Sequence, residues 1–297
     1  MRGRGTSRAP DVAVVTMVRD ECVMLPRWVD HYGRQVGVEH LLVLDDNSTD
    51  GSTEGLVCEV RRVPELPGGE DFERARMRLI NHAAADLLRT HDWVVFADAD
   101  EFLLPDPTQH ESLRRLLAAH SRDSVVGAVG VNVLHDRTTE PPLDPLRPVL
   151  EQRHLAQIVP LMCKPAAKRV RKPWVLASHG IRSHYLVDPA LLMIHLKFAD
   201  RGQLVKSSAH RLGLVARDGR ASKSSWSRDD LPVLLDERVD AVRDLALADF
   251  DEQVATLDLG PHEAGKLRWR TPKGQSQVQA LRQQPVSEIP QRLRSLL

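Results

Sequence analysis

Residues 92–102, DWVVFADADEF, constrain the fold of this chain more than any other stretch. A run of β-branched and aromatic residues leads into three carboxylates and stops at Pro105. Such a run is typical of a strand that is buried on both faces of a parallel sheet. Because side chains alternate along a strand, Asp98 and Asp100 are expected on the same side where this strand ends.

Two neighbouring carboxylates repel each other unless a proton or a cation lies between them. A hard divalent metal with oxygen ligands, Mg²⁺ or Mn²⁺, satisfies that requirement at neutral pH. Asp98 and Asp100 are therefore candidate metal ligands. The alternative interpretation is an ordinary acidic turn after a strand, since short motifs also arise by chance.

Composition excludes several classes of protein. The chain has 297 residues, enough for one large domain with its own core. Lys+Arg and Asp+Glu both number 41, so no net charge favours a nucleic acid partner. Cys22, Cys58 and Cys163 are odd in number and widely spaced, which predicts neither a disulfide framework nor a zinc site.

The expected compartment follows from the same features. Unpaired cysteines suit a reducing cytoplasm. No apolar run approaches the length of a membrane span, and residues 1–10 are basic without the apolar centre of a signal peptide. We expect a soluble cytoplasmic protein, with a peripheral position at the inner face of the membrane as the second expectation.

Hydrophobic patterns predict alternating strands and helices, which is typical of an α/β fold with a mostly parallel, Rossmann-like sheet flanked by helices. The expected strands are 12–18, 38–44, 92–102 and 125–134, with shorter β runs at 158–162, 174–176 and 191–196; the expected helices are 25–35, 72–90, 111–120 and much of the chain after residue 200, where 231–249 is the most amphipathic segment. Residues 61–71 and the Pro-rich residues 138–148 are expected to be loops. The predicted organisation is a flexible N-terminus (1–10), a core (11–215) and a mostly helical C-terminal extension (216–297).

Polar clusters follow three of the expected strands, at residues 16–21, 45–50 and 98–101. Ligands of open parallel sheets bind beyond the carboxyl ends of the strands, so these three clusters predict one pocket. Asp45 or Asp46 could accept hydrogen bonds from a base or ribose, or could instead form an Asx turn and a helix cap. Arg19 and Glu21 are either site residues or a surface pair.

In this order and spacing, TMVRDE at 16–21 with LPRW at 25–28, LDDNSTD at 44–50 and WVVFADADEF at 93–102 resemble the glycosyltransferase family 2 / family 92-like group. These are nucleotide-sugar enzymes with the GT-A fold, and the resemblance covers roughly residues 11–210. It implies that Asp98-Ala99-Asp100 is a DxD motif, in which Asp98 faces the ribose or the metal and Asp100 binds the metal. It also implies that Asp45 and Asp46 lie near the base, and that Thr16, Arg19 and Glu21 line the nucleotide pocket.

Later residues are similar to the late elements of that family. The resemblance implies that His195 completes the metal shell and that Lys197 faces phosphate; Lys206 follows them. A lone histidine is more often structural than a ligand. His179, beside Gly180 in a basic turn, is the weaker candidate.

The chemistry of sugar transfer agrees with such a site. A divalent metal and a lysine would neutralise the leaving diphosphate, and an inverting enzyme needs a carboxylate base for the acceptor hydroxyl. The chain has neither a Glu-Asp motif after the DxD nor a Gln-x-x-Arg-Trp motif, since Gly265 precedes Arg268-Trp269 where Gln is required. The remaining candidates for the base are Glu101, which could instead fix the DxD turn, and the loop residues Asp136, Glu140 and Asp144.

The sequence therefore predicts a glycosyltransferase of the hexosyltransferase kind, dependent on Mn²⁺ or Mg²⁺. It would move a sugar from a UDP- or GDP-sugar to a glycan, lipid-linked or small-molecule acceptor, with inversion implied by the resemblance. The alternative is a GT-A-like domain that binds nucleotide-sugar or glycan without catalysis. A phosphohydrolase of the haloacid-dehalogenase type is disfavoured, because Phe102 stands where its motif has Thr or Val. Residues 164–187 carry six Lys/Arg and no acid, which predicts a solvated face or a contact with diphosphate or an anionic acceptor.

Overall fold

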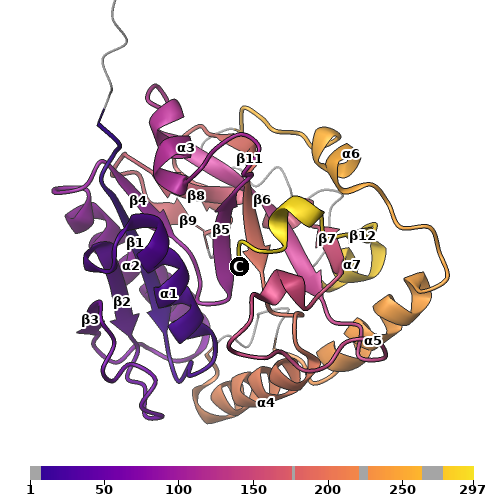
Figure 1. Ribbon diagram of the computed structural model, residues 1–297. Helices are drawn as coiled ribbons and strands as arrows, with labels where there is room; N and C mark the ends of the chain where they lie inside the picture. Colours follow the sequence, from indigo (N-terminus) through magenta and orange to yellow (C-terminus); the bar gives the residue numbers. More distant parts are fainter. Residues whose placement is uncertain (1–7, 176–177, 221–226, 263–276) are drawn as a thin grey trace, which may run out of the picture.

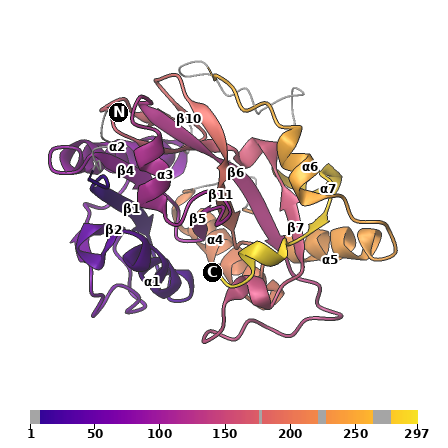
Figure 2. The same ribbon diagram turned by 45° about the horizontal axis from the view of Figure 1, so that its top comes forward.

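The computed structural model of the protein describes residues 8–175, 178–220, 227–262 and 277–297. In this part of the chain a ten-stranded mixed sheet forms the centre, and a separate two-stranded sheet packs beside it. Figures 1 and 2 show the N-terminal strands at one end of the molecule and the C-terminal helices at the other. Residues 1–7 of the expected flexible N-terminus, and Arg268-Trp269, fall outside the described residues.

The N-terminal half is a parallel sheet with the order β4-β1-β2-β3. All seven residues of β1 are buried, as a central strand covered on both faces requires. Helices α1 and α2 make the crossover connections that parallel strands need. The elements of this half are β1 (Val12–Val18), α1 (Met24–Val36), β2 (Leu41–Asp45), β3 (Glu59–Arg62), α2 (Phe72–Leu87) and β4 (Trp93–Phe96).

The second half adds antiparallel neighbours. β8 (Lys164–Lys168) joins the halves by pairing antiparallel with both β4 and β6 (Val125–Leu134). β11 (Leu186–His195) pairs parallel with β6, so the carboxyl ends of β6 and β11 lie side by side. The other elements of this half are β5 (Glu101–Pro105), α3 (Leu113–Ala119), β7 (Leu155–Ile158), β9 (Trp174–Val175) and β10 (Gly180–Ile181).

The C-terminal region is helical, but it also completes the sheet. β12 (Ser287–Glu288) pairs antiparallel with β7. Ile289, Leu293 and Leu297 belong to the main hydrophobic core. The helices are α4 (Arg201–Asp218), α5 (Leu231–Val242), α6 (Phe250–Ala255) and α7 (Gln277–Gln283). The expected boundary between residues 215 and 216 thus falls inside α4.

The predicted α/β fold class, with helices flanking the sheet and a helical C-terminal region, is confirmed. The Pro-rich residues 138–148 form a loop as predicted. Among the described helices, none has both the length and the apolar character that crossing a membrane requires.

Two local predictions were wrong in their details. Residues 38–40 form a 3₁₀ helix before β2 instead of extending it. β7 ends at Ile158, and Pro160 begins another 3₁₀ helix where a strand had been expected. Proline has no backbone N–H to donate to a sheet ladder, which accounts for this second difference.

The opening stretch is not one strand. β4 ends at Phe96, and the backbone N–H of Glu101 donates to the carbonyl oxygen of Asp98 at 2.9 Å, which closes a turn over residues 98–101. Glu101 then begins β5, which pairs antiparallel with β11. The prediction that alternation along a strand places Asp98 and Asp100 on one side was therefore wrong, because both lie in the turn.

The segment 61–71 also differs from the expectation of a loop throughout. Its first two residues belong to β3, whose residues are all exposed at the sheet edge. Charged side chains on a short edge strand prevent pairing with other chains, and they also remove the apolar pattern by which a strand is predicted.

Candidate functional site

A buried ion pair between Glu101 and Lys164 holds the turn that carries Asp98 and Asp100. Lys164 Nζ lies 2.6 and 2.8 Å from the two carboxylate oxygens of Glu101, and it also donates to Ser178 Oγ at 3.0 Å. Glu101 Oε2 accepts from the backbone N–H of Asp98 at 3.0 Å. Burial raises the pKa of Glu101, and the adjacent Lys164 lowers it. The carboxylate of Glu101 is thus committed to holding the turn.

Asp98 forms an ion pair with Arg76 on α2. Arg76 also donates to Glu73 at 3.2 Å. Burial lowers the pKa of Arg76, but Asp98 and Glu73 raise it by more than burial lowers it, so the net shift is upward. Sequence reasoning missed Arg76, since an arginine on a helix otherwise looks like part of a solvated face.

Asp100 lies beside the end of β11. Its Oδ2 is 3.4 Å from His195 Nε2, and its backbone oxygen accepts from the N–H of Leu196 at 2.9 Å. His195 Nδ1 lies 2.8 Å from Asn132 Oδ1, at the end of β6. Because an amide oxygen only accepts, Nδ1 donates and Nε2 is the atom that faces Asp100. This brings the predicted pair Asp100 and His195 together, with Asn132 orienting the ring.

The cationic side chains of Lys197 and Arg211 and the carboxylate of Glu21 lie near Asp100. Burial raises the pKa of Asp100, but His195, Lys197 and Arg211 lower it more strongly, so it lies well below its usual range. Burial, with a smaller contribution from Arg211, lowers the pKa of Lys197 to about 8, although Asp100 and Glu21 raise it. The ends of β1 and β11 and helix α4 therefore meet at one charged centre.

Glu21, predicted from the first strand end, belongs to this centre. Its Oε1 accepts from the backbone N–H of Met24 at the start of α1 at 3.0 Å. Burial raises the pKa of Glu21, and the hydrogen bond from Met24 lowers it; the nearby Asp100 also raises it, while Lys197 lowers it. Arg211 was missed by sequence reasoning, because nothing in the pattern of α4 distinguishes it from the other charged positions of that helix.

The first and second strand ends are joined on the other side of the same edge. Ser48 Oγ accepts from the backbone N–H of Asp20 at 3.0 Å, and Asp45 Oδ1 accepts from the N–H of Ser48 at 2.8 Å. Asp46 Oδ2 lies 3.7 Å from Arg19 Nη1 and 2.9 Å from Nη1 of Arg220, a residue that the sequence did not mark. The turn chemistry expected of Asp45 is thus present, and the three strand ends do converge.

Three buried polar atoms at this edge have no hydrogen-bond partner among the described residues: Thr16 Oγ1, Arg19 Nε and Asp46 Oδ1. Buried polar groups in native proteins are nearly always paired, with protein, water or ligand. These atoms all belong to residues predicted to line a nucleotide pocket. Burial raises the pKa of Asp46, while Arg220, Arg19 and Asn47 lower it.

No cluster of three or more His, Cys, Asp or Glu side chains suited to a metal occurs in the described part of the chain. The three predicted metal ligands are therefore not assembled in advance, since Asp98 forms an ion pair with Arg76 while Asp100 and His195 lie together. The side chain of Asp100 keeps 28% of its surface exposed. Mg²⁺ in proteins commonly takes one or two carboxylates and completes its shell with water and phosphate oxygens. The donor set fits a metal that binds together with a phosphorylated ligand.

The loop candidates for a base lie after the end of β6. Asp136 accepts from the backbone N–H and the hydroxyl of Thr138, at 3.0 and 2.6 Å. Glu140 accepts from the N–H of Asp136 at 3.0 Å and lies 2.6 Å from His154 Nδ1. Asp144 accepts from the N–H of Leu146 at 2.9 Å. Among the described contacts, those of Asp136 and Glu140 stabilise their own loop and its neighbours.

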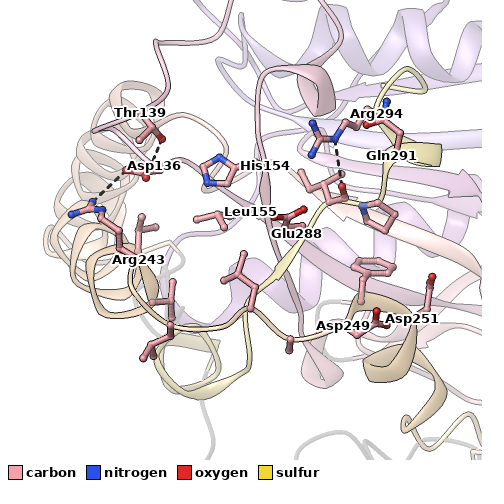
Figure 3. Close-up of a pocket in the computed structure, with 18 residues that line it drawn as sticks. Asp136, Thr139, His154, Leu155, Arg243, Asp249, Asp251, Glu288, Gln291 and Arg294 are labelled. Atoms are coloured by element: carbon pink, nitrogen blue, oxygen red, sulfur yellow. Dashed lines mark hydrogen bonds and ion pairs between the residues drawn. The ribbon is translucent and has the colours of Figure 1, made fainter.

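Asp136 also lines a pocket of about 890 Å³ between this loop and the C-terminal segments. Figure 3 shows Asp136, His154 and Arg243 on one side of it, and Glu288, Gln291 and Arg294 on another. The pocket carries both signs of charge, and its walls come from β7, α5, α6 and β12.

The basic run at 164–187 is not simply a solvated face. Lys164 is buried against Glu101, and Lys168 is buried with its Nζ 3.7 Å from the centre of the Trp174 ring. Both lysines act in the interior, so the solvated-face interpretation was wrong for them. His179 Nδ1 lies 3.1 Å from the carbonyl oxygen of Leu161.

Comparison with known proteins adds a family match. The model of the family described as Glycosyl transferase family 2 matches residues 13–173, which is more than half of the chain. No curated protein matches the sequence significantly.

Among solved structures, the chain is similar to a mannosyltransferase from Pyrobaculum calidifontis in complex with GDP-Man and Mn²⁺, with 17% identity, a TM-score of 0.36, and coverage of 84% of this chain and 80% of that one. It is also similar to glucosyl-3-phosphoglycerate synthase from Mycobacterium tuberculosis, with 23% identity and a TM-score of 0.28. That similarity covers 41% of this chain and 44% of that one.

Proposed function

The chain belongs to glycosyl transferase family 2, and from this premise we propose that it is a metal-dependent enzyme that transfers a sugar from a nucleotide-sugar to an acceptor hydroxyl. Its α/β sheet, flanked by helices, is the GT-A fold of such enzymes. The observation that carries the proposal is the charged centre of Asp100, His195 and Lys197 at the carboxyl edge of the sheet.

The roles follow from the chemistry of these side chains. Asp100 and His195 would hold Mn²⁺ or Mg²⁺, and the metal would stabilise the negative charge that develops on the leaving diphosphate. Lys197, whose charge faces the same centre, would contact the diphosphate. Asp98 would contact the ribose in preference to the metal, since Arg76 already neutralises it and 34% of its side chain is exposed.

The nucleotide would bind at the first and second strand ends. Thr16 Oγ1, Arg19 Nε and Asp46 Oδ1 are buried polar atoms that have no hydrogen-bond partner in the described part of the chain. Asp45 shapes the turn beside them, and Glu21 faces the diphosphate side. We propose a UDP- or GDP-sugar as donor, and a glycan, lipid-linked or small-molecule hydroxyl as acceptor. Inversion remains the stereochemistry that the resemblance implies.

One observation favours the alternative of a binding domain without catalysis. Glu101 is committed to Lys164, while Asp136, Glu140 and Asp144 accept hydrogen bonds within their loop, so each of the four candidate bases has a structural task. Release of UDP or GDP from nucleotide-sugars, measured with and without a panel of acceptors, separates the two functions. An enzyme releases nucleoside diphosphate faster when its acceptor is present, whereas a binding domain releases none.

The site itself is tested by thermal shift with UDP or GDP, with and without Mn²⁺. We expect a Mn²⁺-dependent stabilisation of the wild type that is lost in Asp100→Ala and weakened in His195→Ala. Asp86→Ala, which removes a half-exposed carboxylate on α2, is the matched control and should behave as wild type. The metal assignment is wrong if neither nucleotide stabilises the protein in a Mn²⁺-dependent way, or if Asp100→Ala retains the effect.

A further inference from the structure

We propose that Arg220, at the end of α4, is a positioning residue that holds one carboxylate oxygen of Asp46 and leaves the other for a single ring N–H of the nucleotide base. This arrangement favours uracil or thymine nucleotides over guanine nucleotides. The inference rests on the proposed function, in which the nucleotide binds at the first two strand ends.

Asp46 is fixed before any ligand binds. It is only 3% exposed, and its backbone N–H donates to the carbonyl oxygen of Val18 at 2.8 Å, which ties the end of β2 to the end of β1. Its Oδ2 accepts from Arg220 Nη1 at 2.9 Å and has Arg19 Nη1 at 3.7 Å. Its Oδ1 is buried without a hydrogen-bond partner among the described residues. The two oxygens of this carboxylate therefore have different tasks.

Arg220 is itself held in one orientation. Its Nε lies 2.9 and 2.8 Å from the two carboxylate oxygens of Asp218, and its guanidinium lies over the ring of Phe72 at 5.2 Å from the centroid. The residue is 3% exposed. A planar guanidinium with a carboxylate at one edge and a ring on one face presents its remaining N–H groups in fixed directions. A lysine at this position would supply charge but not this geometry.

The backbone around Arg220 is packed tightly enough to keep that orientation. Gly219 adopts φ 72° at the C-cap of α4, the left-handed conformation that favours glycine. A Cβ on Gly68 would lie 2.3 Å from the carbonyl oxygen of Asp218, so the loop before α2 and the end of α4 are in direct contact. The end of α4 is therefore built onto the nucleotide edge of the sheet.

Asp46 Oδ1, for which the described residues supply no hydrogen-bond donor, decides which base fits. Uracil and thymine offer one ring N–H, flanked by two carbonyl groups that only accept, and a single buried acceptor such as Asp46 Oδ1 suits that pattern. Guanine offers a ring N–H and an exocyclic amine side by side, which a carboxylate binds best with both oxygens. Because Oδ2 already faces two arginines, guanine would leave a donor unpaired, and an unpaired buried donor lowers affinity.

The experiment compares the affinities for UDP, dTDP and GDP by calorimetry in the presence of Mn²⁺. The variants are Arg220→Lys and Arg220→Met, with Arg217→Met as control. Arg217 is a half-exposed arginine of the same helix end that lies 3.5 Å from Asp218. We expect wild type and Arg217→Met to bind UDP and dTDP roughly tenfold or more tightly than GDP. Both Arg220 variants should lose most of that preference.

The ratio of UDP to GDP affinity is the decisive reading, because a purely structural role would weaken both nucleotides alike. The folded fraction of each variant is measured by near-UV circular dichroism, and the affinity is calculated from the concentration of folded protein. If Arg220→Met does not fold, the comparison is made with Arg220→Lys. An unchanged ratio in the Arg220 variants, or tighter binding of GDP by the wild type, overturns this inference alone. Absence of any nucleotide binding by the wild type overturns the proposed function with it.

Discussion

Replacing Lys164 by Met tests whether the buried ion pair beneath the DxD turn stabilises the fold. The side chains of Lys164 and Glu101 are 2% and 4% exposed, and the ammonium group contacts both carboxylate oxygens at 2.6 and 2.8 Å. Methionine keeps most of the apolar stem, so the change mainly removes the charge. Removing one partner of a buried pair leaves an uncompensated charge and costs about 3–5 kcal/mol. That is a large share of a total stability of about 5–15 kcal/mol.

The pH dependence of this loss has a definite sign. Burial already raises the pKa of Glu101, and loss of Lys164 raises it further. A carboxyl group with a folded pKa above its unfolded value contributes stability that is fully present below the unfolded pKa and is lost as the pH rises through the folded pKa. Lys164→Met should therefore be destabilised less at pH 5 than at pH 8, because a larger fraction of Glu101 is protonated at the lower pH.

The assay is urea unfolding followed by tryptophan fluorescence at both pH values. Lys172→Met, which removes an exposed lysine of the same segment, is the control and should change the free energy of unfolding by less than about 0.5 kcal/mol. The double variant Lys164→Met/Glu101→Gln should recover part of the loss, since it leaves no buried charge. A loss below about 1 kcal/mol at pH 8, or an equal loss at both pH values, would refute the reasoning.

Two further predictions concern stability away from the site. Gly130→Ala should lower the free energy of unfolding in urea by roughly 1–3 kcal/mol, because the new Cβ would lie 2.3 Å from the Cβ of Met162. Gly213→Ala in α4 should instead raise it by roughly 0.5–1 kcal/mol, because the new Cβ would have nothing within 4 Å. Equal effects of the two substitutions would contradict this packing. The hydrogen bond to Asp188 raises the pKa of His120, so the stability that this contact contributes is present below about pH 6.5 and is lost as the pH rises through the folded pKa. His120→Asn should therefore lower the free energy of unfolding more at pH 6 than at pH 9. A loss that does not depend on pH would show that the imidazolium is not involved.

The central strands β1 and β6 and the helices of the N-terminal half were predictable because their signals are local. β1 and β6 have the predicted bounds, 12–18 and 125–134, since strands buried on both faces read as continuous apolar runs. The helices α1 and α2 follow from their apolar spacing; α2 begins at the predicted residue, and the other three ends lie one to three residues from the prediction. The convergence of three polar strand ends followed from parallel topology alone, because parallel strands put their carboxyl ends at one edge.

The antiparallel half and the edges were not predictable in the same way. Only four residues separate β5 from β4, and the turn between the two strands is shown by the pairing of β5 with β11 and by the hydrogen bond that closes residues 98–101. β3 and β12 are short edge strands that carry little apolar pattern. Their existence depends on which neighbours the folded chain provides.

The sequence by itself determined the α/β class, and it predicted a site at the carboxyl edge of the sheet with residue types suited to a metal and a diphosphate. Only the tertiary structure decided how the charges of that edge are shared, since Glu101 meets Lys164 across 63 residues and Asp46 meets Arg220 across 174. Hydrophobic periodicity reports burial against a face, and it contains no information on which distant cation will neutralise a given carboxylate. Lys164 therefore holds the turn at residues 98–101, and Arg220, which follows the C-cap of α4, holds Asp46.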